Sequence, residues 1–207
     1  MRNDGPDIYI ALLCAGAGAR FGGDKMAATL EDKPLLTWSL EAARALGAPI
    51  MIITAPDHRP VLDGNRQEVE WHINTDAASG MASSLILAAR HAQARKTERL
   101  LVMLGDMPFV SSATLRRLVA QTRSDSIVAC RYPDTKLGPP ACFGAVRLSV
   151  LLSLSGDTGA RAVLNQPGMA CGLDVTSEEL FDIDTVADLA EAGQRQAAAR
   201  HAGRMRV

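Results

Sequence analysis

Glycines and cations are concentrated in residues 13–25, which read LCAGAGARFGGDK. Glycine has no Cβ, so a ligand can approach its backbone N–H group closely, and successive N–H groups around one concavity form an anion site. Arg20 and Lys25 add positive charge to this segment. A lone GxG is equally well explained as a tight turn between a strand and a helix. Four glycines together with two cations favour a loop that binds phosphate.

Two common phosphate-binding loops do not fit this segment. A P-loop ends in GK[ST], whereas Gly23 is followed by Asp24. The dinucleotide fingerprint places its third glycine inside a helix that starts directly after the strand, and Gly22-Gly23-Asp24 would disrupt such a helix. The spacing therefore disfavours a P-loop enzyme and a Rossmann oxidoreductase.

A carboxylate is the second candidate for chemistry. Asp106 follows the apolar run LLVML at residues 100–104, in the order Gly-Asp-Met-Pro. Ligands of open α/β sheets bind at the carboxyl ends of the strands, where Asp106 would meet the glycine loop. Mg²⁺ usually binds through one or two carboxylates plus substrate phosphates. An ordinary turn before proline is the alternative, but the neighbouring phosphate loop favours Asp106 as a ligand of Mg²⁺ or Mn²⁺.

Alternating strands and helices must position these groups. Apolar runs predict strands over 8–13, 50–54 and 100–104, a shorter strand is expected over 69–73, and 126–130 is a further strand candidate. Helical spacing and capping residues predict helices over 34–46, with Pro34 in the first turn, over 81–94, and from Ser111 or Ser112. Residues 26–33 are expected to form an irregular or hairpin connection. This alternation predicts an α/β fold with a doubly wound, mostly parallel sheet.

The alternation loosens after residue 130. The sequence predicts a loop and strand over 137–146, short helices over 148–154 and 159–165, strands over 169–175 and 180–183, a helix from about Thr185, and a helical, then frayed end over 194–207. No repeat or linker divides the chain. We therefore expect a single domain over residues 1–207.

Composition excludes several classes of protein. The chain has 207 residues, enough for one domain with a substantial core. Its 22 basic and 23 acidic residues nearly cancel, which argues against a nucleic-acid partner. No apolar run approaches the roughly 20 residues that cross a membrane, and the polar start MRNDGPD is unlike a signal peptide. We expect a cytoplasmic protein without a membrane partner.

Cysteines and histidines form no shared motif. The four cysteines are scattered without a CxxC, which predicts small buried strand residues rather than a disulfide or zinc site: Cys14, Cys130, Cys142 and Cys171. The four histidines are expected at the surface or in packing, and not in catalysis: His58, His72, His91 and His201.

The glycine loop resembles the signature of the MobA-like nucleotidyltransferases, L-A-A-G-x-S-x-R-M-G-x-x-K. It matches at Gly16, Arg20, Gly22 and Lys25, and departs at Cys14, Gly18 and Phe21. The GDMP segment resembles the metal-binding G-D-x-P of that family. Residues 182–189 resemble its late D/N-x-D/N-T-P-x-D-L motif, with valine in place of the proline. These motifs keep the family's order from Ala11 to Leu189.

The resemblance implies a set of nucleotide and metal ligands. The nucleotide would be held by Ala15, Gly16, Ala17, Gly18, Arg20, Lys25, Asn74, Gly80, Ser83, Ser84 and Asp106, within a nucleotide-binding half at about 8–130. Helix capping alone would also explain the two serines. Asp182 or Asp184 would join Asp106 at the metal, because alternation along a strand puts both on one face. Capping of the helix at Thr185 is the alternative role of Asp184.

Two further motifs resemble the subgroup that handles the molybdenum cofactor. They are G-x-P-x-x-F and L-x-G-D-x-G-A-R, and they imply acceptor-binding residues in a half at about 131–193: Gly138, Pro140, Phe143, Gly156, Asp157, Gly159 and Arg161. A plain helix N-cap is the alternative role of Asp157.

The resemblance implies transfer of CMP from CTP to molybdopterin phosphate, with Arg20, Lys25 and Asp106 as the catalytic residues. The Ala-Gly-Ala order at 15–17 favours the CTP-using branch over the GTP-using one. A nucleotidyltransferase for a sugar phosphate and a non-catalytic molybdopterin chaperone are the alternatives. The expected partners are small-molecule substrates and a molybdoenzyme or its maturation chaperone.

Overall fold

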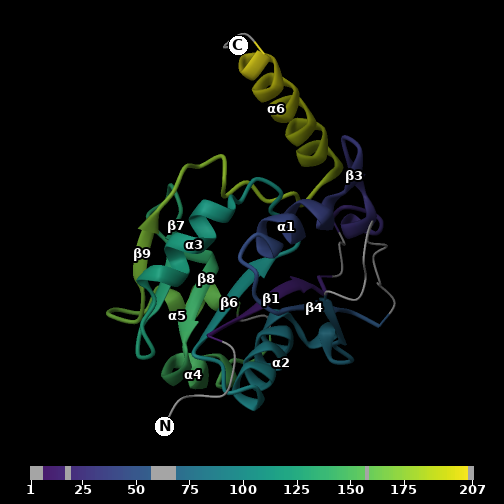
Figure 1. Ribbon diagram of the computed structural model, residues 1–207. Helices are drawn as coiled ribbons and strands as arrows, with labels where there is room; N and C mark the ends of the chain where they lie inside the picture. The colour runs from purple at the N-terminus through teal and green to yellow at the C-terminus, as the bar shows by residue number, and fades with distance from the viewer. Residues whose placement is uncertain (1–6, 17–19, 57–68, 157–158, 205–207) are drawn as a thin grey trace.

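A seven-stranded sheet forms the centre of the computed structural model, which describes residues 7–16, 20–56, 69–156 and 159–204. The strand order is β5-β4-β1-β6-β8-β7-β9 (Figure 1). Its strands are β1 (Ile8–Cys14), β4 (Ile50–Thr54), β5 (Val69–Ile73), β6 (Arg99–Leu104), β7 (Ile127–Arg131), β8 (Leu137–Gly144) and β9 (Cys171–Asp174). Strand β8 runs antiparallel to both of its neighbours, and the other pairings are parallel.

Helices cover both faces of this sheet. They are α1 (Leu35–Arg44), α2 (Met81–Ala94), α3 (Ser112–Gln121), α4 (Leu148–Leu152), α5 (Ala160–Leu164) and α6 (Val186–Arg204), with 3-10 turns η1 (Lys25–Ala27), η3 (Ala77–Ser79) and η4 (Ala145–Arg147). The predicted doubly wound, mostly parallel α/β fold is confirmed. None of the described helices is long and apolar enough to cross a membrane.

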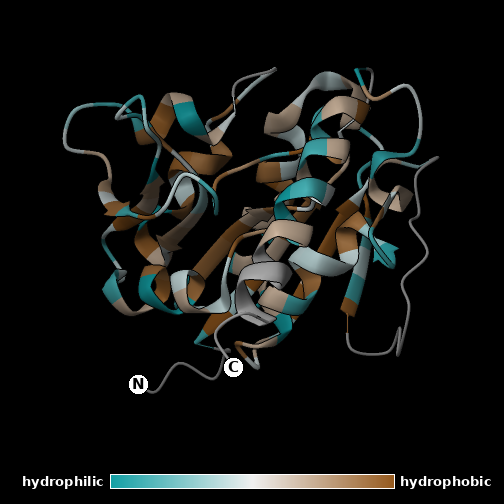
Figure 2. Ribbon diagram, turned by 90° about the horizontal axis from the view of Figure 1, so that it is seen from above, coloured by the Kyte–Doolittle hydropathy of each residue, from teal (hydrophilic) through white to brown (hydrophobic). Residues whose placement is uncertain are grey.

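The continuous apolar strands have a simple cause, because each buries both faces. In β1, Ile10, Leu12 and Cys14 pack with residues of α1 and α3, while the alternate positions Tyr9 and Ala11 pack with residues of α2 and α4. The strands form the brown, hydrophobic layer between helices in Figure 2. Strands covered on both faces read as unbroken apolar runs rather than as alternating patterns.

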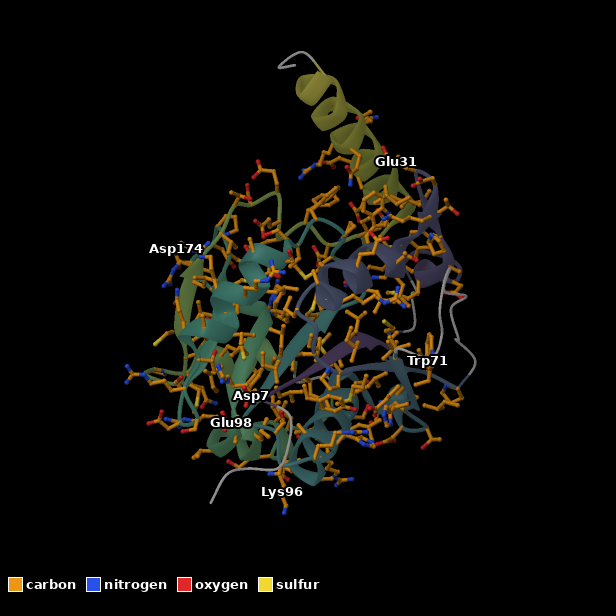
Figure 3. The ribbon with its side chains drawn as sticks, viewed as in Figure 1. Asp7, Glu31, Trp71, Lys96, Glu98 and Asp174 are labelled. Carbon is orange, nitrogen blue, oxygen red and sulfur yellow. The ribbon has the colours of Figure 1, made fainter. Side chains whose placement is uncertain are left out.

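Most of the predicted elements match the structure closely. Helix α2 has the predicted bounds, and Ser111 caps α3 by accepting a hydrogen bond from the Thr114 N–H group at 3.1 Å. The expected hairpin is the pair β2 (Thr29–Leu30) and β3 (Lys33–Pro34), which turns at Glu31 beside the start of α6 (Figure 3). Pro34 ends β3 and precedes α1 instead of lying in its first turn.

The predicted strand over 180–183 is wrong. Turns shape this segment, because the N–H groups of Leu180 and Phe181 bond back to residues 177 and 178. Leu180 and Ile183 are buried, so their apolar character serves the packing of an irregular segment. The Ile183 N–H group donates to the Asp106 carbonyl oxygen at 3.0 Å, which ties the segment to the end of β6.

The expectation for the cysteines is correct at three positions and wrong at Cys171. All four are free, and the other three are buried in strands. Cys171 is exposed because it begins β9, a four-residue strand at the sheet edge. Asp174, at the other end of β9, lies at the periphery of the molecule in Figure 3.

Helix α6 starts at a reciprocal cap. The Asp188 carboxylate accepts hydrogen bonds from the Asp184 and Thr185 N–H groups, and the Thr185 hydroxyl accepts one from the Asp188 N–H group. Reciprocal bonds of this kind stabilise the first turn of a helix. The alternative in which Asp184 caps the helix is therefore wrong, and its carboxylate is available elsewhere. From this cap α6 extends away from the body of the molecule (Figure 1).

Two of the histidines pack together at the edge of the sheet. The rings of His72 and His91 lie 4.0 Å apart between centroids, beside Glu70, which accepts a hydrogen bond from Tyr9 and pairs with Arg95. Burial, then His72 and Arg95, lower the pKa of His91, while Glu70 opposes them. Neither histidine lines the cavities described below. His58 and the side chain of His201 lie outside the described part.

The His91 environment predicts a pH-dependent stability. Its pKa in the folded chain lies below the unfolded value near 6.5, so the unfolded chain binds more protons below that pH and stability falls as pH decreases. We expect His91→Gln to make the urea midpoint less sensitive to pH between about 7 and 5. Equal slopes for the variant and the unmodified chain would contradict this expectation.

Candidate functional site

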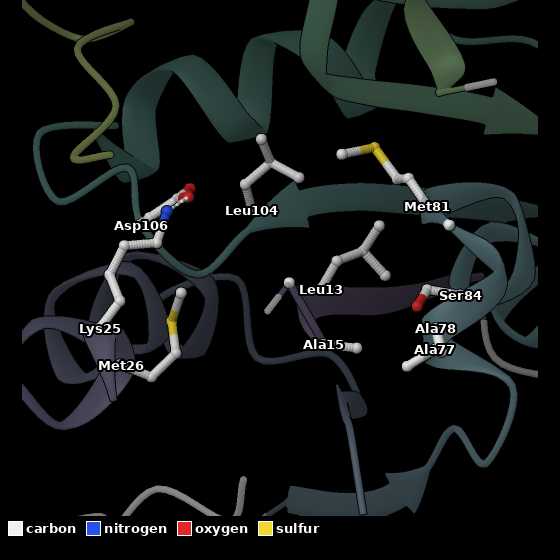
Figure 4. Close-up of a pocket in the computed structure, with 12 residues that line it drawn as sticks. Leu13, Ala15, Lys25, Met26, Ala77, Ala78, Met81, Ser84, Leu104 and Asp106 are labelled. Carbon is white, nitrogen blue, oxygen red and sulfur yellow. Dashed lines mark hydrogen bonds and ion pairs between the residues drawn. The ribbon is translucent and has the colours of Figure 1, made fainter. Parts of the chain in front are cut away.

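Two cavities meet at the carboxyl ends of β1 and β6, where an open α/β sheet binds its ligands. The first, of about 430 Å³, is lined by Leu13, Ala15, Gly16, Lys25, Met26, Ala77, Ala78, Gly80, Met81, Ser84, Leu104 and Asp106 (Figure 4). The second, of about 320 Å³, is lined by Met81, Leu104, Asp106, Pro139, Gly159, Ala160, Arg161, Asp182 and Asp184. Met81, Leu104 and Asp106 border both cavities.

The glycine loop reaches the first cavity through Ala15 and Gly16. At Gly16, no described atom outside its chain neighbours lies within 4 Å of the place where a Cβ would be. Packing within the described chain therefore does not demand a glycine there, and the open space suits close approach of a ligand to the backbone. Ala17 and Gly18, predicted as part of the same loop, lie outside the described residues.

A lysine and two carboxylates form the charged centre of the site. The Lys25 Nζ donates to Asp106 Oδ2 at 2.6 Å and to Asp184 Oδ1 at 3.1 Å, as the dashed line between Lys25 and Asp106 marks in Figure 4. The Lys25 and Asp106 side chains are only 11% and 14% exposed. Arg20, which is largely exposed, lies 3.5 Å from the other Asp184 oxygen. The structure thus brings four of the predicted charged side chains together.

Burial and charge act in opposite directions on this pair. Burial raises the pKa of Asp106, Lys25 opposes that rise, and the nearby Asp182 carboxylate adds to it. Burial alone would lower the pKa of Lys25, but Asp106 and Asp184 more than offset it and the pKa is raised. Lys25 therefore stays protonated at neutral pH.

The donor set fits a divalent metal completed by a substrate. Asp106 Oδ1 is buried and has no hydrogen-bond partner among the described residues, and Asp182 and Asp184 line the second cavity beside it. Within the same part of the chain, no three His, Cys, Asp or Glu side chains form a metal site by themselves. Mg²⁺ needs only one or two carboxylates when phosphates supply further oxygens, so these residues suit Mg²⁺ or Mn²⁺.

Asp182 and Asp184 line the second cavity, but they do not belong to a strand, as the alternation of their side chains had predicted. They flank Ile183, whose N–H group bonds to the backbone of Asp106. That bond holds both neighbours of Ile183 at the mouth of the second cavity, although the segment is not a strand. Both carboxylates therefore line the cavity, although the strand from which this was expected is not formed.

Asn74 organises the start of α2 rather than lining a cavity. Its buried side chain donates to Ser83 Oγ at 2.8 Å and to Ser84 Oγ at 2.9 Å, and accepts from the Asp76 N–H group. Gly80 precedes the helix with φ +106° and ψ 177°, a conformation that residues with a Cβ rarely adopt. Of the two serines, Ser84 lines the first cavity.

We expect Asn74→Ala to lower the free energy of unfolding by about 2 kcal/mol, because it leaves the Asp76 N–H group and two hydroxyls without their partner. It should also raise KM for the nucleotide several-fold, since Ser84 loses its anchor. The matched control is Ser79→Ala, which removes an exposed hydroxyl from the same segment. Equal KM values for the two variants would show that Asn74 does not position the site.

The second cavity has Arg161 as its cation. The Arg161 guanidinium lies over the Tyr132 ring, 4.3 Å from its centroid, and the Tyr132 hydroxyl donates to the Pro139 carbonyl at 2.7 Å. A Cβ on Gly138 would lie 2.8 Å from the Tyr132 ring and 2.9 Å from Arg161 Nε. Gly138 therefore makes room for this stacked pair, which holds Arg161 at the cavity.

The remaining predicted acceptor residues have different places in the structure. Gly159 lines the second cavity, whereas Gly156 accepts a hydrogen bond from the Ala82 N–H group and links its loop to α2. Pro140 and Phe143 are buried in β8 and do not line the cavity. Phe143 packs in the hydrophobic core on the side of the sheet that α2 and α4 cover. Asp157 lies outside the described residues.

Sequence reasoning missed Tyr132 and Met81. Tyr132 has no motif of its own and is identified only by its contact with Arg161. Met81 stands directly after Gly80, so its place in the segment 74–85 was the available signal.

Comparison with known proteins relates the chain to one family. Residues 10–170 match the model of the MobA-like NTP transferase domain. The chain is 30% identical over 195 residues to nicotine blue oxidoreductase of Paenarthrobacter nicotinovorans, covering 88% of this chain and 95% of that protein. It is 27% identical over 198 residues to the purine catabolism protein PucB of Bacillus subtilis (strain 168), covering 87% and 93%.

The fold is also similar to that of a solved protein. The crystal structure of Rv0371c from Mycobacterium tuberculosis H37Rv superposes with a TM-score of 0.75 at 26% identity, covering 92% of this chain and 98% of that one. A structure of Rv0371c in complex with manganese gives a TM-score of 0.72 at 25% identity, covering 92% and 99%.

Proposed function

The chain belongs to the MobA-like NTP transferase family, and from that membership we propose that it transfers CMP from CTP to the phosphate of molybdopterin and releases pyrophosphate. One observation carries the proposal: two cavities, each bordered by a cation, join at the Asp106 carboxylate. A transferase must hold donor and acceptor side by side in reactive geometry. Family and fold both support nucleotidyl transfer.

The proposed reaction needs no nucleophile from the protein. An oxygen of the acceptor phosphate forms a bond to the α-phosphorus of CTP. The bond from that phosphorus to the bridging oxygen breaks, and pyrophosphate leaves with the electron pair. The contribution of the chain is positioning and electrostatic stabilisation, as in other phosphoryl-type transfers.

Each charged side chain has a proposed role in this step. The backbone at Ala15 and Gly16 holds the triphosphate in the first cavity, where Lys25 and Arg20 offset its negative charge. Arg161 binds the acceptor phosphate in the second cavity, because the Tyr132 ring orients its guanidinium. The attacking and leaving oxygens then lie on either side of Asp106.

Asp106, with Asp182 or Asp184, would hold Mg²⁺ or Mn²⁺. When bound, the metal supplies positive charge that neutralises the phosphate oxygens. Two observations support it: the Asp106 oxygen that has no hydrogen-bond partner within the described part of the chain, and the manganese named in the complex of Rv0371c.

The proposal also specifies the base of the nucleotide and the chemical class of the acceptor. The order Ala15-Gly16-Ala17 supports CTP over GTP, and the motifs around Arg161 support molybdopterin over a sugar phosphate. The name of one relative, nicotine blue oxidoreductase, raises redox chemistry as a second candidate.

An acceptor panel tests the proposal. The purified chain is incubated with CTP and Mg²⁺ in three reactions, which contain molybdopterin, glucose 1-phosphate or no acceptor. The products are identified by mass spectrometry. A CMP adduct of molybdopterin alone is the expected result. An adduct of glucose 1-phosphate would move the function to sugar nucleotides. Oxidation of NADH in a parallel assay, without any adduct, would favour the redox candidate.

A further inference from the structure

Met81 stands where the two cavities join. Met81 borders both cavities, and 45% of its surface is exposed although its side chain is apolar. Figure 4 shows its thioether extending from the start of α2 toward Leu104, which also borders both cavities. The mechanism proposed above gives this side chain no role.

The backbone around Met81 is held in place from two sides. Gly80 sets the start of α2 with a conformation that glycine adopts readily. The next residue, Ala82, donates its N–H group to the Gly156 carbonyl oxygen at 3.3 Å. The thioether is therefore presented to the second cavity from a fixed point, while its flexible side chain can adjust to a ligand.

The second cavity combines an apolar wall with a charged one. Its side chains are apolar at Met81, Leu104, Pro139 and Ala160, and charged at Asp106, Arg161, Asp182 and Asp184, and none of the described lining residues carries a neutral polar side chain. The charged wall suits a phosphate and a metal. A sugar ring against the apolar wall would bury hydroxyl groups without hydrogen bonds, which is costly.

We propose that Met81 is a specificity-determining residue, whose thioether packs against the ring of the acceptor and selects phosphate esters of flat aromatic rings over sugar phosphates. Methionine sulfur makes favourable contacts with aromatic rings, and its unbranched chain fits irregular surfaces. The inference rests on the proposed function, because it takes the second cavity as the acceptor site.

Gly159 provides an independent way to disturb the same contact. A Cβ at Gly159 would lie 3.1 Å from the Met81 sulfur, so the absence of a side chain there leaves room for the thioether. The backbone of Gly159, with φ −77° and ψ 173°, is open to any residue. Gly159→Ala should therefore crowd Met81 without straining the chain.

Binding of two probe compounds tests this inference without turnover. Dissociation constants for benzyl phosphate and glucose 1-phosphate are measured by titration calorimetry with Mg²⁺ present. The unmodified chain should bind benzyl phosphate more tightly. Met81→Ser should weaken benzyl phosphate about tenfold and change glucose 1-phosphate little, whereas Met81→Leu should keep most of the preference. Gly159→Ala should reduce the preference as well.

Three results would overturn the inference: equal weakening of both probes by Met81→Ser, no weakening of either, or failure of the unmodified chain to bind them. Thermal unfolding of each variant is measured in parallel to check that the fold is kept. If the selectivity shift holds while the chain releases no pyrophosphate with any nucleotide, the assignment of Met81 stands and the proposed function falls.

Discussion

Replacement of Asp106 by asparagine is expected to reduce nucleotidyl transfer about a thousandfold, which is the scale of losing one preorganised electrostatic group. The carboxylate lines both cavities, and its Oδ1, which has no hydrogen-bond partner among the described residues, is placed to bind a metal. Asparagine has the same shape but carries no charge. The rate of pyrophosphate release at saturating substrates measures the loss.

The fold should survive this change, because Lys25 retains Asp184 as a partner. Asp32→Asn is the matched control, since it neutralises an exposed carboxylate in the β2–β3 turn. That control should keep the full rate, and both variants should show the circular dichroism of the unmodified chain. A rate for Asp106→Asn within a few-fold of the control would remove Asp106 from the reaction.

Lys25→Met is the second change with a large expected effect. It leaves the buried Asp106 without the cation that lies 2.6 Å away, and loss of one partner from a buried pair costs about 3 kcal/mol of stability or more. It also removes positive charge from the first cavity, so transfer should fall by about a hundredfold. Urea unfolding and pyrophosphate release measure the two effects separately.

A double variant tests whether Lys25 and Asp106 contribute to the stability of the folded chain as a coupled pair or independently. With Lys25→Met and Asp106→Asn together, no buried charge remains unpaired at the two positions, so the double variant should be more stable than Lys25→Met alone. Costs that simply add would show that the hydrogen bond at 2.6 Å contributes no coupling to the stability of the folded chain.

Much of the fold could be predicted, because strands buried on both faces leave long apolar runs in the sequence. The run at Ile50–Thr54 has the bounds of β4 and is buried throughout. The antiparallel pairing of β8 could not be predicted from the sequence, because the direction of a strand does not change the pattern of its residues. The prediction for 180–183 failed for a related reason: Leu180 and Ile183 are buried in a segment shaped by turns, and the Ile183 N–H group bonds to the Asp106 carbonyl oxygen.

The charged residues of the candidate site could be predicted, but their contacts could not. Lys25 meets Asp106 and Asp184 across separations of 81 and 159 residues, so no local pattern reports the pairing. The same holds for the Tyr132 ring beneath Arg161 and for Met81 between the cavities. Such groups act through their place in the folded chain, and their residue types alone suggest ordinary packing.

Pyrophosphate release by the unmodified chain is the first experiment to make on the proposed nucleotidyl transfer. The chain is given molybdopterin and Mg²⁺ with CTP, GTP, ATP or UTP in parallel reactions. We expect release with CTP and little with the other three nucleotides. Release with GTP instead would keep the mechanism and change the base, whereas no release with any of the four nucleotides would contradict the proposed transfer to molybdopterin.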